Sequence, residues 1–154
     1  MNETAAPPEI VMWLSSRYPN IELAEAFLDV VCRERGFSEE TEHWIGMALR
    51  EALANAIKHG NRQDPAKRVL VGLGGDACTF TIEVGDEGAG FAPGDVADPL
   101  APENQMKTSG RGIFYMRTFM DEVAFSRGAA GGTLLTLKKN VGTTSTTTKG
   151  VEAS

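Results

Sequence analysis

The chain has 154 residues, of which 42% are hydrophobic, so it is long enough for one globular domain and too apolar to be disordered throughout. Its formal net charge of −6, with no run rich in Lys and Arg, argues against a nucleic-acid-binding surface. No apolar run reaches the ~18 residues of a membrane span and the first residues lack the pattern of a signal peptide, so we expect a cytoplasmic protein with no membrane partner.

The first part of the chain predicts a tail, a strand and a helix. Residues 1–8 are expected to form a flexible tail, and the apolar run 9–14 a strand. We expect Pro19 and Asn20 to interrupt the chain before a helix that spans residues 21–34. This helix is predicted from apolar residues that recur every three or four positions. They are Leu23, Phe27, Val30 and Val31.

The core is expected to form around a second helix, between Ser38 and Gly60. Ser38 can cap its first turn, and the two glutamates that follow suit the positive end of the helix dipole. The two cysteines, Cys32 and Cys78, have no C-x-x-C spacing and are most simply interpreted as further core residues. One side of the helix is apolar and should face the core. It consists of Ile45, Leu49, Ala52, Leu53 and Ala56.

The second half of the chain predicts four strands, a long loop and a short helix. The strands are expected at 67–74, 77–85, 122–127 and 132–139. A turn at 74–76 should join the first two as a hairpin. Residues 87–109 are rich in Gly, Pro and Asp, and because structureless segments of this length are usually functional, we interpret them as a lid. A helix is expected at 112–119, and residues 140–154 should be a disordered tail. This order predicts an α+β fold, a two-layer sandwich with helices on one face of a mostly antiparallel sheet.

The second helix also carries a polar stripe, formed by Glu51, Asn55, Lys58 and His59. Such a stripe is either a helix face in water or a binding site. The alanines beside it allow close approach, and an asparagine inside a helix has poor helix propensity, which together favour a site. An amide oxygen is a suitable ligand for Mg²⁺ held together with phosphates, so Asn55 is a candidate metal ligand. Glu51, one turn earlier, is placed to take a proton from a nucleophile and is a candidate catalytic base.

A second candidate site follows the predicted strand that ends near residue 85. The carboxylate of Asp86 can accept a hydrogen bond from an exocyclic amine such as that of adenine. Gly88 and Gly90 would let the backbone turn and approach a flat ring closely. The segment is equally compatible with an ordinary glycine-rich loop.

Two further segments add candidates for nucleotide binding. The first opens the predicted helix at 112–119, and free N–H groups at a helix start attract phosphate. Its candidates are Thr108, Ser109, Gly110, Arg111 and Gly112. Arg111 can add a charge-assisted contact to phosphate or to a protein partner. Thr133, which follows two glycines, can contact the base. A flexible helix entry and a plain turn into a strand are the simpler explanations of these segments.

In this order and at these spacings, the motifs resemble the GHKL, or Bergerat-fold, superfamily of ATPases and kinases. The helix with Glu51 and Asn55 resembles its N box, the segment from Asp86 to Gly90 its G1 box, and residues 110–112 its G2 box. The resemblance assigns residues 9–139 to one ATP-binding kinase domain. Within the superfamily, the pattern E-A-x-x-N-A-x-x-H-G with S-G-R-G-I in one short domain is similar to the anti-sigma-factor serine kinases of the sporulation and general-stress type.

This resemblance implies a Bergerat ATP-binding fold with an ATP lid. It also implies a kinase that uses ATP and Mg²⁺ to phosphorylate a serine or threonine of an anti-sigma-factor antagonist, a STAS-domain protein, and that also binds a sigma factor and forms a homodimer. Glu51 then matches the general base, Asn55 the Mg²⁺ ligand and Asp86 the adenine contact. The residues left to shape the nucleotide pocket are Lys58, His59, Gly88, Gly90, Thr108, Ser109, Gly110, Arg111, Gly112 and Thr133.

Three other functions remain open at this point. The first is a GHKL ATPase in which Glu51 activates water, although larger machines of this type use further domains. The second is the catalytic part of a histidine kinase, although no phospho-acceptor helix hairpin precedes the motifs. The third is a module that regulates a partner by binding it without kinase activity, although such a module has no need of Glu51.

Overall fold

The computed structural model describes residues 8–89, 116–128 and 131–141. A short helical turn at 116–119 precedes the fourth strand. Within the described ranges, no helix is both long enough and apolar enough to cross a membrane. The other elements, in chain order, are β1 (Pro8–Ser15), α1 (Pro19–Arg35), α2 (Glu39–Asn55), the π-helical turn η1 (Ala56–Gly60), β2 (Arg68–Gly75), β3 (Thr79–Gly85), β4 (Glu122–Arg127) and β5 (Thr133–Asn140).

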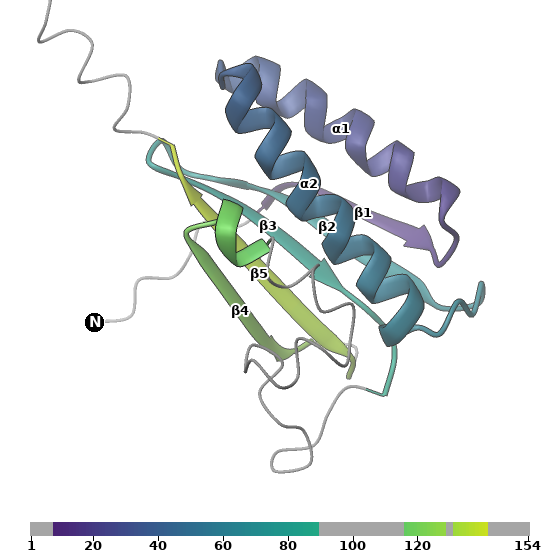
Figure 1. The fold of residues 1–154 in the computed structure, drawn as a ribbon. Helices are drawn as coiled ribbons and strands as arrows, with labels where there is room; N and C mark the ends of the chain where they lie inside the picture. Colours follow the sequence, from purple (N-terminus) through teal and green to yellow (C-terminus); the bar gives the residue numbers. More distant parts are fainter. Residues whose placement is uncertain (1–7, 90–115, 129–130, 142–154) are drawn as a thin grey trace, which may run out of the picture.

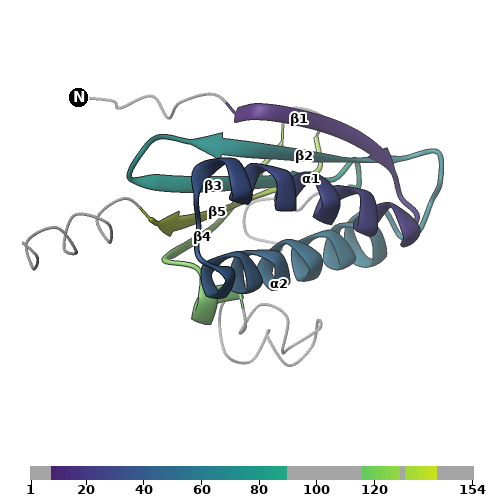
Figure 2. The same cartoon turned by 90° about the horizontal axis from the view of Figure 1, so that it is seen from above.

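The strands form a single sheet in the order β1-β2-β3-β5-β4, and every neighbouring pair is antiparallel. Helices α1 and α2 lie side by side on one face of this sheet (Figures 1 and 2). The predicted α+β fold with two layers and an antiparallel sheet is therefore confirmed.

The core lies between the helices and the sheet. The apolar side of the second helix is buried as predicted, with exposed fractions of 8% or less: Ile45, Leu49, Ala52, Leu53 and Ala56. It packs with large apolar residues that alternate along three strands, as expected of strands with one covered face: Val69, Val71, Leu73, Phe80, Ile82, Val84, Leu135 and Leu137. Met116 and Met120 are buried in the same cluster.

Helix α1 differs from its prediction in where it begins and in which side is buried. Pro19 does not interrupt the chain but stands in the first turn of the helix, where a proline is tolerated because its missing N–H would have no partner in the helix. Leu23, Phe27 and Val30, three of the four residues that predicted the helix, are about half exposed. The side that packs on the core is formed by Ile21, Ala24, Leu28, Val31 and Cys32.

The second helix begins as predicted and ends differently. Its N-cap is Ser38, whose Oγ accepts a hydrogen bond from the backbone N–H of Thr41 at 3.1 Å. The α-helix ends at Asn55, however, and the chain continues to Gly60 as the π-helical turn η1 rather than as the same α-helix.

The hairpin between β2 and β3 turns later than predicted. Its turn is built on Asp76, whose Oδ1 accepts hydrogen bonds from the backbone N–H groups of Cys78 and Thr79, both at 2.8 Å. An aspartate that satisfies backbone donors two and three positions on stabilises a turn at that place, which leaves residues 74 and 75 inside β2. Cys78 is therefore exposed in the turn and is not the core residue we expected, whereas Cys32 is buried.

The strands also reach into both predicted tails. Pro8 pairs with Gly74 at the start of β1, and β5 continues to Asn140, after which the N–H of Val141 donates to the carbonyl of Cys78 at 2.9 Å. The rest of both tails, all of the predicted lid from residue 90 onward and the first part of the predicted helix at 112–119 lie outside the described residues.

Candidate functional site

The polar stripe lies where α2 ends and η1 begins. Glu51 and Asn55 are half-buried on the last turns of α2, and Lys58 and His59 follow as exposed residues of η1. The N–H of Asn61 donates to the carbonyl five residues back, at 2.8 Å, so this turn is wider than an α-helical one. The four residues thus follow one another at the helix end but do not share the single α-helical stripe we predicted.

His59 differs from an ordinary surface histidine. Partial burial and the neighbouring charge of Lys58 lower the pKa of His59. Both effects favour the neutral imidazole, and Lys58 is the lysine of η1 at this end of α2.

Asp86 stands directly after β3, and the backbone holds its carboxylate in one orientation. Oδ1 accepts hydrogen bonds from the N–H of Gly88 at 3.0 Å and from the N–H of Thr133 at 3.1 Å. The N–H of Asp86 in turn donates to the carbonyl of Thr133 at 3.0 Å. None of the described residues donates a hydrogen bond to Oδ2. Thr133 thus contacts Asp86 through its main chain, and the contact that we expected between Thr133 and the base stays a prediction.

Three glycines from separate segments pack against Asp86. A Cβ atom on Gly60 would overlap Oδ2 of Asp86, and one on Gly132 would overlap its carbonyl and Oδ1. A Cβ on Gly88 would overlap the carbonyl of Gly60. Only residues without a side chain therefore allow η1, the loop after β3 and the start of β5 to approach this closely. Neither Gly60 nor Gly132 is among our predicted site residues, although Gly60 ends the pattern E-A-x-x-N-A-x-x-H-G and Gly132 directly precedes Thr133.

Asn61 and Glu87 are two further residues at this site that the sequence did not suggest. Asn61 is fully buried, and its Oδ1 accepts a hydrogen bond from the N–H of Glu87 at 2.8 Å. The carboxylate of Glu87 accepts a hydrogen bond from the N–H of Arg68 and lies 3.5 Å from its guanidinium, and these contacts lower the pKa of Glu87. The loop after Asp86 is thereby tied to the residue that follows η1 and to the first residue of β2.

The structure brings together only part of the predicted site. Asp86, Gly88 and Thr133 are joined by hydrogen bonds, and Gly60 places the end of η1 against them. The other predicted pocket residues, Gly90, Thr108, Ser109, Gly110, Arg111 and Gly112, lie outside the described residues.

The donor set at the helix end limits what cation it can hold. In the described part of the chain, no group of three or more His, Cys, Asp or Glu side chains is arranged to hold a metal ion. Mg²⁺ accepts a single protein ligand when water and phosphate oxygens complete its octahedron. The amide oxygen of Asn55 therefore fits a Mg²⁺ ion that arrives with a polyphosphate, and not a metal held by protein ligands alone.

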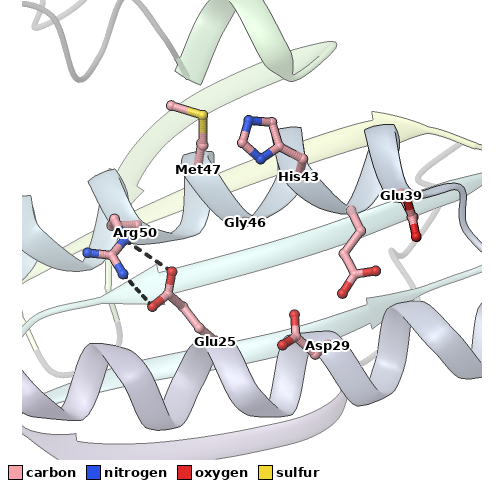
Figure 3. Close-up of a pocket in the computed structure, with 8 residues that line it drawn as sticks. Glu25, Asp29, Glu39, His43, Gly46, Met47 and Arg50 are labelled. Atoms are coloured by element: carbon pink, nitrogen blue, oxygen red, sulfur yellow. Dashed lines mark hydrogen bonds and ion pairs between the residues drawn. The ribbon is translucent and has the colours of Figure 1, made fainter.

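A surface groove lies elsewhere, between α1 and α2, and includes none of the predicted site residues (Figure 3). Arg50 spans it to Glu25 through two hydrogen bonds, of 2.7 and 3.1 Å. A hydrogen bond to Asp29, together with partial burial, raises the pKa of Glu42. The lining residues are Glu25, Asp29, Glu39, Glu42, His43, Gly46, Met47 and Arg50.

Comparison with known proteins gives a family match over most of the chain. The sequence profile of the histidine kinase-like ATPase domain matches residues 14–139. This range includes every predicted site residue and runs from the end of β1 into β5.

Individual relatives carry two kinds of name. The chain is 35% identical over 99 residues to the anti-sigma F factor of Geobacillus thermodenitrificans, and this alignment covers 63% of the chain and 68% of the relative. It is 30% identical over 105 residues to the serine-protein kinase RsbW of Bacillus licheniformis, with 62% and 64% covered. A second serine-protein kinase RsbW, from Oceanobacillus iheyensis, is 24% identical over 120 residues, with 74% and 76% covered.

Proposed function

The chain belongs to the histidine kinase-like ATPase domain family, which has the Bergerat fold, and from this membership we propose that it is an ATP-dependent serine/threonine protein kinase. Because its relatives are named anti-sigma F factor and serine-protein kinase RsbW, we also propose that it acts as an anti-sigma factor. Its substrate is an anti-sigma-factor antagonist, a STAS-domain protein. Its second partner is a sigma factor, which it binds and withholds from transcription.

The arrangement around Asp86 is the observation that carries this proposal. Two backbone donors occupy Oδ1 and leave Oδ2 to accept a hydrogen bond from the exocyclic amine of adenine. The glycines let η1, the loop after β3 and the start of β5 pack closely around this carboxylate, which fixes the position of the acceptor. An acceptor held in this way favours adenine over a base that presents a carbonyl at the same position.

The residues at the end of α2 supply the chemistry of transfer. Phosphoryl transfer needs mainly positioning and neutralisation of charge, with a base to receive the proton of the nucleophile. Glu51 takes the proton of the serine or threonine hydroxyl. The hydroxyl oxygen forms a bond to the γ-phosphorus of ATP, and the bond from that phosphorus to the departing ADP breaks.

Asn55 is the residue that holds the metal, through its amide oxygen. When bound, Mg²⁺ supplies neutralisation of the phosphate charge. Lys58 lies on η1, which follows Asn55 directly, and contributes a further positive charge near the phosphates. Asn55 and Glu51, four residues apart on α2, keep the metal ligand and the base one turn from each other.

We also propose that the protein is a homodimer, and the outer surface of α1 supports this. Leu23, Phe27 and Val30, which we call the α1 stripe, are 52%, 47% and 46% exposed. Their spacing of four and three residues places them on one side of the helix, which is the pattern of a helix that packs against a partner. Among the described residues, β1 also lies at an edge of the sheet. A second copy of the chain covers this apolar stripe.

Calorimetric titration with ATP and with ADP, in the presence and absence of Mg²⁺, tests the nucleotide site. The informative variant is Asp86→Asn. Because two backbone N–H groups hold the side-chain oxygen at the Oδ1 position, the new amide must direct its NH₂ group at the adenine amine, and donor then faces donor. We expect ATP affinity to fall by about 10- to 100-fold, as for the loss of a hydrogen bond to a charged group.

The control is Glu83→Gln, which removes a carboxylate from β3, three residues before Asp86. This variant should bind ATP like the wild type. Asp86→Asn with unchanged affinity would remove Asp86 from the site. Transfer of labelled γ-phosphate to a purified STAS-domain protein from the same genome then separates a kinase from an ATPase, which releases the label as inorganic phosphate, and from a module that only binds nucleotide.

A further inference from the structure

We propose that Asn61 is a positioning residue for base recognition, which sets the location of Asp86 by holding the peptide group that follows it. The inference rests on the proposed function, because it assumes that Asp86 contacts adenine. It adds a residue to which the sequence analysis assigned no role.

Asn61 is one of only two buried polar residues in the described part of the chain, and its amide group is fully used. Nδ2 donates to Oγ of Ser16 at 2.6 Å and to the carbonyl of Arg68 at 2.9 Å. Oδ1 accepts from the N–H of Glu87 at 2.8 Å. The two ends of the amide thus have different tasks. The nitrogen forms hydrogen bonds with the residue after β1 and the first residue of β2, and the oxygen forms one with the loop after β3.

The bond to Glu87 acts directly on Asp86. The N–H of Glu87 and the carbonyl of Asp86 belong to one planar peptide group, so a partner that fixes the N–H also fixes the plane of the carbonyl. The other side of Asp86 is fixed by its backbone and side-chain bonds to Thr133. Asn61 therefore fixes Asp86 through a hydrogen bond from the side of η1, and Thr133 fixes it through hydrogen bonds from β5.

The backbone after Asn61 shows that this placement is enforced. Arg62 and Gln63 both have left-handed backbone angles, with φ of 54° and 59°, although neither is glycine. Consecutive left-handed residues with side chains are costly and persist where the surrounding structure determines them. Hydrogen bonds from Gln63 N–H to the carbonyl of Ile57 (2.7 Å) and from Asp64 N–H to the carbonyl of Asn61 (3.0 Å) close this turn and keep Asn61 facing inward.

A second hold on the loop makes the role of Asn61 testable by mutation. The carboxylate of Glu87 remains bound to Arg68, whose guanidinium in turn lies 4.6 Å from the ring centre of Trp13. Loss of the Asn61 bond alone therefore loosens the position of Asp86 without releasing the loop.

The experiment compares the affinities for ATP and inosine triphosphate, which carries a carbonyl in place of the adenine amine, and measures the melting temperature of each variant. Asn61→Ala should weaken ATP binding about tenfold, as expected for one lost hydrogen bond, and should weaken inosine triphosphate binding much less. Asn61→Asp keeps an acceptor for the Glu87 N–H but places an anion beside the Arg68 carbonyl. It should restore the preference for ATP while the melting temperature stays low.

Ser16→Ala is the matched control. It removes the hydrogen bond from Asn61 Nδ2 to Ser16 Oγ and the bond from Ser16 Oγ to the carbonyl of Lys67, and it leaves the bond from the Glu87 N–H to Asn61 in place. It should therefore lower the melting temperature and leave the preference for ATP unchanged. If Asn61→Ala does not fold, Asn61→Ser replaces it in the comparison, because its shorter side chain cannot reach the Glu87 N–H.

The outcomes separate the inference from the function on which it rests. Equal losses for both nucleotides, in proportion to the melting temperature, would show that Asn61 is only structural and would overturn the inference while leaving the proposed function intact. A wild-type protein that binds neither nucleotide would overturn the proposed function and the inference with it. Wild-type protein that binds both equally would show that Asp86 does not read the amine, which also overturns the inference.

Discussion

At the scale of single residues, Glu51 separates a kinase from a nucleotide-binding module. The proposed base is half-buried one turn before Asn55. Glu51→Gln removes the proton acceptor and keeps the shape, so ATP affinity should stay within about threefold of the wild type. Phosphate transfer should fall at least about 100-fold, the usual effect of losing a general base. A filter assay with labelled ATP and a STAS-domain protein measures the transfer, and calorimetry measures the binding.

The same exchange at Glu83, on β3, serves as the control for Glu51→Gln. Normal transfer by the Glu51 variant would exclude Glu51 as the base. Loss of ATP binding would instead give it a role in holding the nucleotide.

The two cysteines should differ sharply in reactivity. Burial, together with the nearby carboxylates of Glu42 and Asp29, raises the pKa of the Cys32 thiol to about 12, whereas Cys78 is exposed in the β2–β3 turn. Thiolate is the form that reacts, so Cys32 is protected both by access and by its pKa. Mass spectrometry after treatment with iodoacetamide should find one adduct, on Cys78, in the native protein and two in guanidinium chloride. Two adducts under native conditions would contradict the buried position of Cys32.

Some individual residues could not have been found from the sequence. A buried asparagine has no compositional signature. Asn61 is buried at low cost only because Ser16, Arg68 and Glu87, which lie far apart in the chain, satisfy its amide. Glu51, Asn55 and Asp86 could be proposed because their residue types and spacing suggest chemistry without any knowledge of long-range contacts.

At the scale of elements, α1 shows what periodicity leaves undecided. Both sides of this helix carry apolar residues, and a period of 3.6 residues shows that a helix is present without showing which side the sheet covers. The core takes the side of Leu28, so the α1 stripe remains outside. A similar limit applies to η1. Ala56 and Ile57 continue the apolar pattern of α2. The pattern does not show that the backbone hydrogen bonds change from four to five residues back at this point.

The α1 stripe yields a test of the homodimer. Phe27→Glu places a charge at its centre, so the protein should become monomeric in light scattering at micromolar concentration. Its melting temperature, measured at matched monomer concentration, should change little apart from the loss of dimerisation, because Phe27 is 47% exposed within one chain. Glu22→Lys changes the charge at an exposed position of α1 that is neither three nor four residues from any member of the stripe, and it should leave the dimer intact. Unchanged mass for Phe27→Glu would show that the stripe is not the dimer contact.

The contact between α1 and α2 should make stability depend on pH. A hydrogen bond to Asp29 raises the pKa of Glu42, and the negative charge of Asp29 raises it further, so the two carboxylates repel each other when both are ionised. A group whose pKa is higher in the folded state stabilises the fold when protonated and loses that contribution as the pH rises through the folded pKa. Glu42→Gln, which is neutral and can donate to Asp29, should therefore raise the melting temperature at pH 7, and its advantage should shrink as the pH falls.

Glu40→Gln is the control for this measurement. It removes a carboxylate from the same first turn of α2, and with it the same favourable interaction with the helix dipole, but Glu40 is not among the groups that raise the pKa of Glu42. An equal effect of the two variants at pH 7 would show that repulsion between Glu42 and Asp29 contributes nothing.

At the scale of the whole molecule, nucleotide binding should stabilise the fold, because Asp86 is bonded to β5 and, through its loop, to the residue after η1. A ligand at about 100 times its dissociation constant stabilises the native state by about 2.7 kcal/mol. For a chain of this size, that should raise the melting temperature by about 5–10 °C. Scanning calorimetry with and without Mg²⁺ and ATP measures this shift, and the Asp86→Asn variant should show less of it at the same nucleotide concentration. An unshifted wild-type transition at saturating ATP would contradict the nucleotide site.

The global architecture could be predicted from the sequence because all five strands and both helices carry their own local signals. The alternation of apolar residues in β2, β3 and β5 and the helical spacing in α2 are each sufficient without the others. The assembly of the site could not be predicted to the same degree. The approach of Gly60, Gly88 and Gly132 to one carboxylate depends on sheet register and on the exit angle of η1, and neither is encoded by a local pattern.

The position of β1 has a consequence for the order of folding. The β2–β3 and β4–β5 hairpins close short loops. In contrast, both helices lie between β1 and β2 in the chain, so the pairing that places Ser15 opposite Arg68 closes a long loop. Short loops close at lower entropic cost, so the hairpins form readily and β1 docks late. Asn61 joins the residue after β1 to the loop after β3, so the peptide group beyond Asp86 reaches its final place only when β1 has docked. We therefore expect a chain whose hairpins have formed and whose β1 is still detached to bind nucleotide weakly, so tight binding should mark a chain that has finished folding.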